Sequence, residues 1–355
     1  MRLWEKNIRK VTPYVPGEQP NKPNMVKLNT NENPYPPAPG VRKVLQNMDT
    51  SKLRMYPDPT SDLLIDELAR FYHLDKEQVF VGVGSDDVLA MVFMTFFNSD
   101  KPILFPDITY SFYPVWCNLL SIPYETPALD EQFRIRKEDY YKENGGIVIA
   151  NPNAPTSIYE EIFVMEDIIK HNPSSIVIVD EAYIDFAGKS CIELINKYDN
   201  LLVVQTFSKS RSMAGMRIGF AMGNSELINA LNNVKYSFNS YTMDLASILT
   251  GVEAVKDVEY FRETVNKIIV TREQSEERLK SLGFNFPKSC TNFIFATHER
   301  IDAKTIYEEL RKNDIYVRYF DMPRVDNYLR ISIGTKDEME RFFSFLEHWM
   351  INYNK

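Results

Sequence analysis

Three apolar runs decide the fold: GGIVIAN (145–151), SSIVIVDEA (174–182) and LLVVQTFSK (201–209). Continuous apolar runs of this length are typical of strands that are buried on both faces of a sheet. Helical segments separate such runs along the chain. The alternation predicts an α/β fold with a mostly parallel sheet covered by helices.

Weaker runs on either side extend this pattern. The sequence predicts further strands at QVFVGVG (78–84), KPILFP (101–106) and RIGFAMGN (217–224), and helices at SDLLIDELARFYHL (61–74) and SDDVLAMVFMTFF (85–97). Ser61 is the expected N-cap of the first of these helices. One large domain therefore takes up residues 41–240.

The last third of the chain follows a long helical region at about 243–282 and has a different pattern. It combines the strand-like runs TNFIFAT (291–297), IYVRYF (315–320) and YLRISIG (328–334) with a closing helix at 336–350. We predict a linking helix and a smaller α+β domain over 241–355. The Pro- and Asn-rich residues 1–40, which end in LNTNENPYPPAPG, are predicted to be an extended arm on the small domain.

Composition excludes several classes of protein. A net charge of -8 over 355 residues argues against a general nucleic-acid binder, which would show a basic footprint. The three cysteines are far apart and in no CxxC spacing, so neither a disulfide framework nor a zinc site is expected, and no metal is predicted. No segment resembles a signal peptide or a membrane span, which favours the cytoplasm and no membrane partner.

The residues that directly follow the strands carry the candidate chemistry. In an open α/β sheet, ligands bind beyond the carboxyl ends of the strands. There the sequence places GVGSDD (82–87), NPNAPTS (151–157), DEAYIDF (180–186) and TFSKSRSMAGMR (206–217). The first of these turns can present the N-terminus of a helix to an anion. The four segments together offer an anion cradle, a buried acid, a phenol and an amine.

Lys209 and Asp180 are the two strongest single candidates. A lysine forms a Schiff base with an aldehyde only when part of it is neutral. The hydroxyls of Thr206 and Ser208, with Arg217 nearby, suit a pocket that holds a phosphate. A carboxylate at Asp180 can face a cationic ring nitrogen; at about 4 Å and an effective dielectric near 20, that pair is worth roughly 4 kcal/mol before desolvation.

The segment TFSKSRSMAGMRIGF (206–220) resembles the S-K-x(6)-G-x-R segment of fold-type-I pyridoxal-phosphate (PLP) enzymes. Most similar in pattern is the histidinol-phosphate aminotransferase family. Its motifs occur here in the family's order and approximate spacing: LNTNENP, YPDP, GVGSDD, DITYSFY, NPNAPT, DEAYIDF, SKSRSMAGMR and YLRISIGT. The resemblance covers almost the whole chain and implies a large PLP-binding domain, a small domain and a homodimer with shared active sites.

The resemblance also implies roles for single residues around the cofactor. Lys209 would hold PLP as the internal aldimine and move protons in a ping-pong transamination. Asp180 would keep the ring nitrogen protonated, and Tyr183 would bond the ring oxygen. The remaining cofactor contacts would come from Ser85, Asp86, Tyr110, Asn153, Thr206, Ser208 and Arg217, and from Tyr56 of the other subunit.

Substrate contacts follow from the same resemblance. Arg330 and Arg318 would grip the anionic end of the substrate, and Tyr14, Asn31 and Glu32 would line its pocket through the arm. The arm would also pack on the partner subunit. A phosphorylated amine, with 2-oxoglutarate and glutamate as acceptor and product, is the implied substrate set.

Two residues depart from the family's usual NPNNPTG motif. Ala154 stands where an asparagine often contacts the ring oxygen, and Ser157 replaces a turn glycine. Asn153 or Tyr183 alone is expected to make that contact.

Other functions fit parts of the same sequence. L-Threonine-phosphate decarboxylases of the cobalamin pathway and aromatic amino-acid aminotransferases resemble this family in most of these motifs. A P-loop NTPase would use AGKS (187–190), but Tyr183 stands where the loop needs its first glycine.

Overall fold

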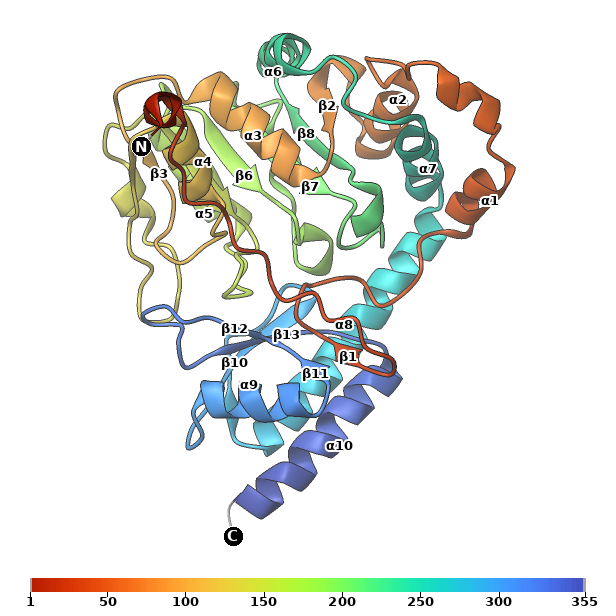
Figure 1. The fold of residues 1–355 in the computed structure, drawn as a ribbon. Helices are drawn as coiled ribbons and strands as arrows, with labels where there is room; N and C mark the ends of the chain where they lie inside the picture. The colour runs from red at the N-terminus through yellow and green to blue at the C-terminus, as the bar shows by residue number, and fades with distance from the viewer. Residues whose placement is uncertain (1, 354–355) are drawn as a thin grey trace.

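The protein divides into a large helix-covered sheet and a smaller sheet, which the long helix α8 (Val258–Ser281) connects (Figure 1). The computed structural model describes residues 2–353. The large sheet contains β2 (Val79–Gly82), β3 (Ile103–Leu104), β4 (Tyr124–Glu125), β5 (Gly146–Ala150), β6 (Val177–Asp180), β7 (Leu201–Thr206) and β8 (Gly219–Gly223).

The strand order of the large sheet is β2-β8-β7-β6-β5-β3-β4. The pairs from β7 through β4 are parallel, whereas β8 runs antiparallel to both β2 and β7. The predicted mostly parallel sheet is therefore confirmed. Its parallel strands all end at one edge, and that edge carries Asp180 and the residues after β7.

Helices cover both faces of the large sheet. One face carries α3 (Ser85–Phe96), α4 (Tyr113–Leu120) and α6 (Ser225–Phe238). The other carries α1 (Pro39–Asn47), α2 (Asp62–Tyr72), α5 (Ile162–His171) and α7 (Leu245–Lys256). Alternate strand residues serve the two faces: Val177 and Val179 pack under the second set, and Ile178 under the first. This two-sided burial explains why the strands read as continuous apolar runs.

The small domain is an antiparallel sheet with helices beside it. Its strand order is β12-β13-β10-β9, with β9 (Phe284–Asn285), β10 (Phe293–His298), β12 (Arg318–Tyr319) and β13 (Leu329–Ser332). Helices α9 (Ala303–Lys312) and α10 (Lys336–Tyr353) complete it. The short 3-10 helices are η1 (Leu3–Asn7), η2 (Thr50–Arg54), η3 (Lys76–Gln78), η4 (Lys137–Tyr140), η5 (Ile184–Phe186), η6 (Cys191–Leu194) and η7 (Ala214–Met216).

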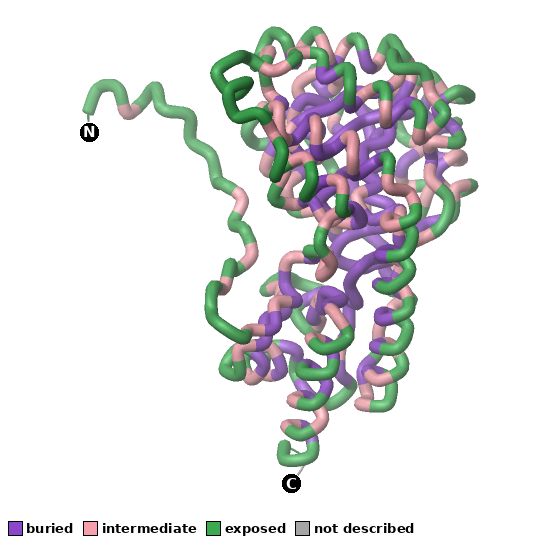
Figure 2. Tube along the Cα trace, turned by 90° about the vertical axis from the view of Figure 1, so that its right-hand side faces the viewer, coloured by how far each residue is buried: buried purple, intermediate pink, exposed green. Residues whose placement is uncertain are grey.

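The N-terminal arm has two parts that behave differently. Its first residues form an exposed segment that stands away from the body of the molecule (Figure 2). Its later residues form β1 (Val26–Lys27), which pairs in parallel with β11 (Ile315–Tyr316). Val26 and Leu28 are almost fully buried, so this part belongs to the core of the small domain.

Two details of the helices differ from the sequence-based expectation. Ser61 precedes α2, but its side chain makes no capping bond; Asp58 instead accepts the N–H of Asp62 at 2.8 Å. The expected long helical region is two helices, because Asp257 ends α7 and its side chain accepts the N–H of Tyr260 to begin α8.

The domain division at residues 1–40, 41–240 and 241–355 stays a prediction. α7 packs against α1 and α2, so the first helix after residue 240 lies with the helices of the large sheet. Within residues 2–353, no helix is both long and apolar enough to cross a membrane.

Candidate active site

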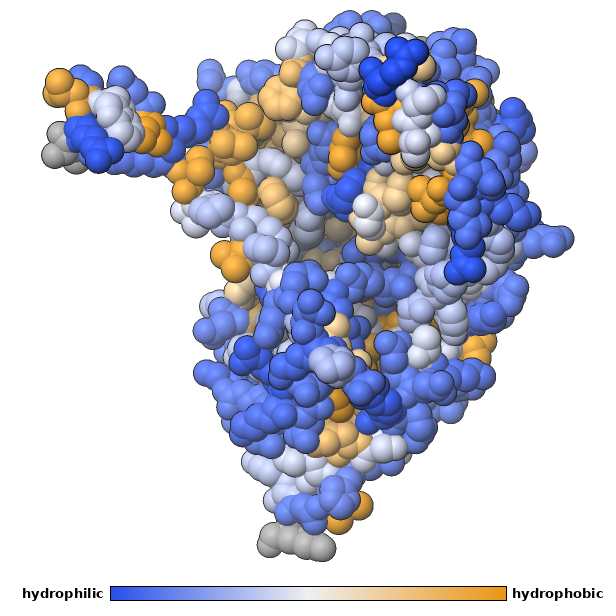
Figure 3. All heavy atoms as spheres, turned by 45° about the vertical axis from the view of Figure 1, so that its right-hand side comes forward, coloured by the Kyte–Doolittle hydropathy of each residue, from blue (hydrophilic) through white to orange (hydrophobic). Residues whose placement is uncertain are grey.

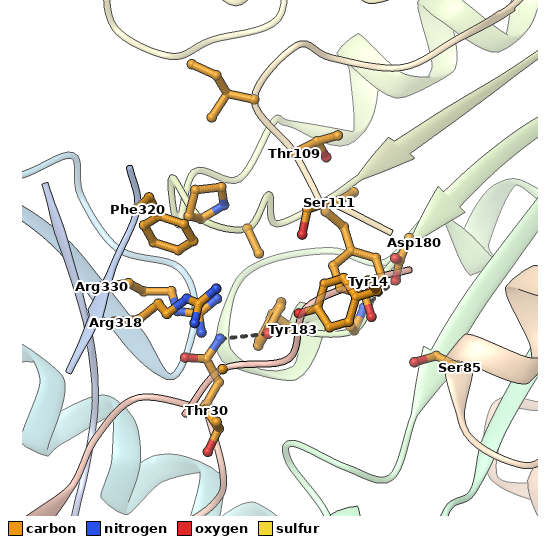
Figure 4. Close-up of a pocket in the computed structure, with 18 of the residues that line it drawn as sticks. Tyr14, Thr30, Ser85, Thr109, Ser111, Asp180, Tyr183, Arg318, Phe320 and Arg330 are labelled. Carbon is orange, nitrogen blue, oxygen red and sulfur yellow. Dashed lines mark hydrogen bonds between the residues drawn. The ribbon is translucent and has the colours of Figure 1, made fainter. Parts of the chain in front are cut away.

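A cavity of about 640 Å³ lies where the carboxyl edge of the large sheet faces the small domain and the arm. Figure 3 shows the molecule hollowed between the large domain and the small domain. Residues of the large domain, the small domain and the arm line it, and their side chains converge there (Figure 4). The cavity therefore joins three regions that are far apart in the sequence.

Lys209 enters this cavity from the loop that follows β7. Its Nζ lies 3.4 Å from the carbonyl oxygen of Thr30 and 5.8 Å from the centre of the Tyr183 ring. Within residues 2–353 it forms no ion pair. The Asn33 amide donates to the carbonyl oxygens of Lys209 (2.9 Å) and Ser210 (3.1 Å), which fixes the backbone of the loop. The amine is thus held in place and open to a ligand.

Asp180 ends β6 at the floor of the cavity. Burial raises the pKa of its carboxyl to about 6, while hydrogen bonds from Tyr113 Oη (2.7 Å) and the Ala182 N–H (3.3 Å) oppose that rise. The negative charge of Asp86 adds to the rise. A cationic ring nitrogen beside this carboxyl would favour the ionised form again.

An anion cradle forms where β2 turns into α3. Gly84 has φ +84°, and a Cβ there would lie 2.5 Å from Arg217. A Cβ on Gly219 would lie 2.3 Å from the backbone of Gly84 and Ser85. Both glycines are therefore required for Arg217 to lie beside the N-terminus of a helix, where free N–H groups bind anions.

Acidic and hydroxyl side chains organise this cradle. Asp86, in the first turn of α3, accepts from Arg217 at 3.1 Å and from the Tyr110 hydroxyl at 2.7 Å. The hydroxyl of Thr206 donates to that of Ser208 at 3.0 Å and accepts the N–H of Ser208 at 3.1 Å. Ser208 and Ser85 face the cavity, so the cradle can offer hydroxyl and backbone donors to a phosphate.

Arg318 and Arg330 are direct cross-strand partners on β12 and β13. Like charges opposite one another destabilise a sheet. Neither forms an ion pair within the described residues. Burial lowers the pKa of Arg330, whose Nη2 donates to the carbonyl oxygen of Asn29 at 3.0 Å. Its buried Nε has no hydrogen-bond partner among residues 2–353.

Phe320 lies next to both guanidinium groups (Figure 4). A pair of uncompensated cations with an unused donor is a site for an anion.

Most of the predicted site residues line this cavity. They are Tyr14, Asn31, Glu32, Ser85, Asp86, Tyr110, Asp180, Tyr183, Ser208, Lys209, Arg217, Arg318 and Arg330. Thr206 and Asn153 do not: Thr206 supports Ser208, and the Asn153 amide is bonded to Ile108, Thr109 and Thr156. Ala154 lines the wall instead.

Tyr56 lies away from the cavity of its own chain. It is 82% exposed and stacks on Tyr241 at 4.7 Å between ring centres. Leu53 and Met55, which are near Tyr56 in the sequence, are also exposed, and so are Tyr236 and Phe238, which are near Tyr241. The contact of Tyr56 with a second subunit's cofactor stays a prediction.

Four residues that support the site were not singled out from the sequence. Tyr113 bonds Asp180, Asn33 holds the Lys209 loop, and Thr30 and Asn29 offer carbonyl oxygens to Lys209 and Arg330. Three of them belong to LNTNENP, in which only Asn31 and Glu32 were given roles. The signal that could have indicated them was the alternation of asparagines in a segment without helical or strand periodicity, because asparagine side chains often bond to backbone groups.

A buried polar network lies behind the site. The carboxylate of Glu181 accepts bonds from Ser190 Oγ (2.6 Å), the Cys191 N–H (2.7 Å) and Gln205 Nε2 (2.9 Å). Tyr72 donates to Gln205 at 2.7 Å. Burial raises the pKa of Glu181 to about 7, and its three donors oppose the rise.

Replacing Glu181 by glutamine should therefore change how stability depends on pH. A carboxyl whose pKa rises from 4.5 in the unfolded chain to about 7 in the folded one stabilises the fold fully below pH 4.5. That contribution is lost as the pH rises through 7 and amounts to about 3 kcal/mol.

Denaturant unfolding of the cofactor-free protein at pH 4.5 and pH 8 tests this. The wild type should lose about that much unfolding free energy relative to Glu181→Gln. A difference between the two proteins that stays constant with pH would contradict it.

The family model for aminotransferase class I and II matches residues 23–346. The chain therefore belongs to the class I and II aminotransferase family. Curated histidinol-phosphate aminotransferases match it over nearly its full length, so within that family it belongs to the histidinol-phosphate aminotransferases.

The relative from Clostridium botulinum (strain Langeland / NCTC 10281 / Type F) is 50% identical over 341 residues, which are 96% of each chain. The relative from Lactococcus lactis subsp. cremoris (strain MG1363) is 48% identical over 352 residues, which are 99% of each chain.

A solved structure shares the fold. The histidinol-phosphate aminotransferase of Sinorhizobium meliloti, solved in complex with pyridoxal-5'-phosphate, superimposes with a TM-score of 0.84 at 21% identity. The match covers 92% of this chain and 91% of that one. The predicted fold class is confirmed.

Proposed function

We propose that the protein transfers the amino group of L-histidinol phosphate to 2-oxoglutarate, a step of L-histidine biosynthesis. It is a PLP-dependent transaminase. The observation that carries the choice of substrate is the pair Arg318 and Arg330. Within residues 2–353 these two cations have no carboxylate partner, and they lie beside an aromatic wall. Histidinol phosphate has a phosphate and no carboxylate, and a guanidinium fork binds phosphate well.

The residues of the cavity fit the cofactor. Pyridoxal phosphate has an aldehyde, a ring nitrogen, a ring hydroxyl and a phosphate, and the cavity offers one partner for each. They are the amine of Lys209, the carboxyl of Asp180, the phenol of Tyr183, and the cradle of Ser85, Ser208 and Arg217. When bound, the cofactor supplies an electron sink for the carbon that bears the amino group.

The chain's own residues then position and move protons. Asp180 would hold a positive charge at the ring nitrogen, and Tyr113 keeps that carboxyl oriented. Lys209 would hold the cofactor and would carry a proton to and from the carbon that bears the amino group. Tyr110 lines the cofactor side of the cavity and is fixed by Asp86. Arg330 and Arg318 hold the substrate at a fixed distance from Lys209.

The other readings of the sequence are less well supported. The two arginines would also hold threonine phosphate, and the aromatic wall would suit an aromatic amino acid. The relatives at about 50% identity favour histidinol phosphate over both. The P-loop reading is wrong. AGKS (187–190) is followed by the four-residue 3-10 helix η6, which offers no helix N-terminus for a phosphate.

Product analysis tests the proposed reaction. The purified enzyme is incubated with 2-oxoglutarate and either L-histidinol phosphate, L-threonine phosphate or L-phenylalanine. Glutamate should form in equal amount to imidazole-acetol phosphate, at a kcat/KM well above that for the other amines. Release of CO₂ from threonine phosphate, or equal rates with phenylalanine, would overturn the choice of substrate.

We also propose a cytoplasmic homodimer in which Tyr56 completes the partner's phosphate site. The exposed apolar residues around Tyr56 support a buried interface there. Light scattering should give twice the mass of one chain. Mixing Lys209→Ala and Tyr56→Ala chains should restore activity that neither has alone, since one of the two sites is then intact. A monomer, or no gain on mixing, would contradict this arrangement.

A further inference from the structure

Asn31 links the small domain to the cofactor side of the cavity. It lies just after β1 with φ +55°, a conformation that asparagine tolerates better than most residues. Its backbone N–H donates to Ser332 Oγ at 2.9 Å, and its carbonyl oxygen accepts from Asn292 Nδ2 at 2.9 Å. Ser332 ends β13. Residues of the small domain thus hold Asn31 from two sides.

The hydrogen bonds at Ser332 determine which way the Asn31 amide points. Ser332 Oγ accepts the backbone N–H of Asn31, so its single proton is free to be donated, and it lies 3.0 Å from Asn31 Oδ1. The Ser332 hydroxyl donates to Asn31 Oδ1, so the amide oxygen faces Ser332. The amide nitrogen is left facing Tyr183 Oη, at 2.8 Å (the dashed bond in Figure 4).

This orientation fixes the direction of the Tyr183 proton as well. A phenol has one proton, and Tyr183 Oη already accepts from Asn31, so its own proton points elsewhere. Within residues 2–353, Tyr183 Oη donates to no acceptor, and its side chain lines the cavity. The proton is therefore available to a ligand on the cavity side.

Ala154 makes this arrangement more important in this chain. It lines the cavity and packs in the same apolar cluster as Tyr183, and it has no donor to offer. Asn153 turns its amide away, onto Ile108 and Thr156. Tyr183 is thus left to serve the ring oxygen of the cofactor without an amide from position 153 or 154.

We propose that Asn31 is a positioning residue, set by Ser332 of the small domain, that turns the Tyr183 hydroxyl proton toward the ring oxygen of PLP. The sequence suggested that Asn31 contacts the substrate. The residue is 1% exposed, and both ends of its amide are already bonded within the protein. This inference rests on the cofactor and not on the choice of amine.

The test is a pH titration of the visible absorption of the PLP-loaded enzyme without substrate. The group that titrates is the nitrogen joining Lys209 to the cofactor. A donor to the nearby ring oxygen withdraws negative charge, so loss of that donor should raise the midpoint. A hydrogen bond to a charged group corresponds to a shift of about one pH unit.

Asn31→Asp reverses the polarity of the contact, because a carboxylate accepts where the amide donates. Tyr183 would then donate to residue 31 and not to the cofactor. The midpoint should rise by about one pH unit, similar to the rise for Tyr183→Phe. In a Tyr183→Phe background, Asn31→Asp should add less than half of its single effect.

Asn24→Asp is the matched control, since Asn24 is an exposed arm residue with φ +59°. Its midpoint should not move.

Ser332→Ala is a second, independent test that leaves both cofactor-side residues in place. It frees the Asn31 amide to flip and should raise the midpoint in the same direction by a smaller amount. That rise should disappear when Tyr183 is phenylalanine.

The proposal is overturned if Asn31→Asp and Ser332→Ala leave the midpoint unchanged while Tyr183→Phe raises it, or if their effects simply add to that of Tyr183→Phe. Failure of the unsubstituted enzyme to transaminate L-histidinol phosphate, with the midpoint shifts as expected, would count against the proposed function alone.

Discussion

Replacing Lys209 by alanine should remove the covalent link to PLP and lower kcat by about 10⁴-fold or more. Lys209 Nζ is the amine that points into the cavity next to Tyr183, and its loop is fixed by Asn33. The change removes both the group that binds the cofactor and the group that moves the proton. The phosphate cradle and Asp180 are untouched, so the protein should still bind PLP, without the absorption of the lysine-bound form.

A surface lysine provides the control for this change. Lys197 pairs with Glu166, its side chain is more than half exposed, and it does not line the cavity. Lys197→Ala should keep the visible spectrum and the rate of the wild type. A Lys209→Ala enzyme that retains the lysine-bound absorption and full turnover would remove Lys209 from the mechanism.

Replacing Arg330 by alanine should lower kcat/KM for L-histidinol phosphate by about 10²-fold to 10³-fold. Losing one partner of a buried charge contact costs about 2–5 kcal/mol. Arg330 is buried, and its Nε is free for an anion. The spectrum of the bound cofactor should not change, because Arg330 lies at the end of the cavity formed by the small domain. Arg318→Ala should act in the same direction.

A substrate without the phosphate separates this role from a general defect. L-Histidinol should lose much less of its kcat/KM than L-histidinol phosphate in the Arg330→Ala enzyme. Arg278→Ala is the matched control, since Arg278 pairs with Glu340 and Glu347 on the outside of the small domain. If both amines lose activity equally, or neither does, Arg330 does not bind the phosphate.

The large sheet could be predicted from the sequence because its signal is local. Three strands are buried on both faces, at residues 147–150, 177–180 and 201–206. Each of them therefore appears in the sequence as a continuous apolar run. The antiparallel course of β8 was not visible, since the direction of a strand depends on the connection before it. The break between α7 and α8 at Asp257 was also missed, because an aspartate within a helical pattern is equally consistent with an exposed position on one continuous helix.

The arm shows the limit of local signals more clearly. Residues 26 and 27 form a strand only because β11, almost 290 residues later, offers a free edge. The sequence around them is polar and rich in proline, and no periodicity marks the pairing. A long-range backbone pairing of this kind overrides what the local composition indicates.

In the candidate site, too, residues with a local sequence signal were predicted and residues that act over long sequence distances were not. Residues in motifs at strand ends, such as Asp180 and Lys209, converge on the cavity as predicted from the geometry of parallel sheets. The residues that orient them were missed, because Tyr113 and Asn33 act across 67 and 176 positions of sequence. Asn31 was expected to contact the substrate, whereas its bonds to Ser332 and Tyr183 became visible only in the folded chain.

The most direct test of the central claim is a half-reaction. The enzyme is loaded with PLP and mixed with L-histidinol phosphate in the absence of any keto acid, while the visible spectrum is recorded. We expect the lysine-bound form to disappear and the amine form of the cofactor to accumulate in equal amount, and 2-oxoglutarate to reverse the change. If the spectrum stays in the lysine-bound form with histidinol phosphate while threonine phosphate loses CO₂, the protein is a decarboxylase and not a histidinol-phosphate transaminase.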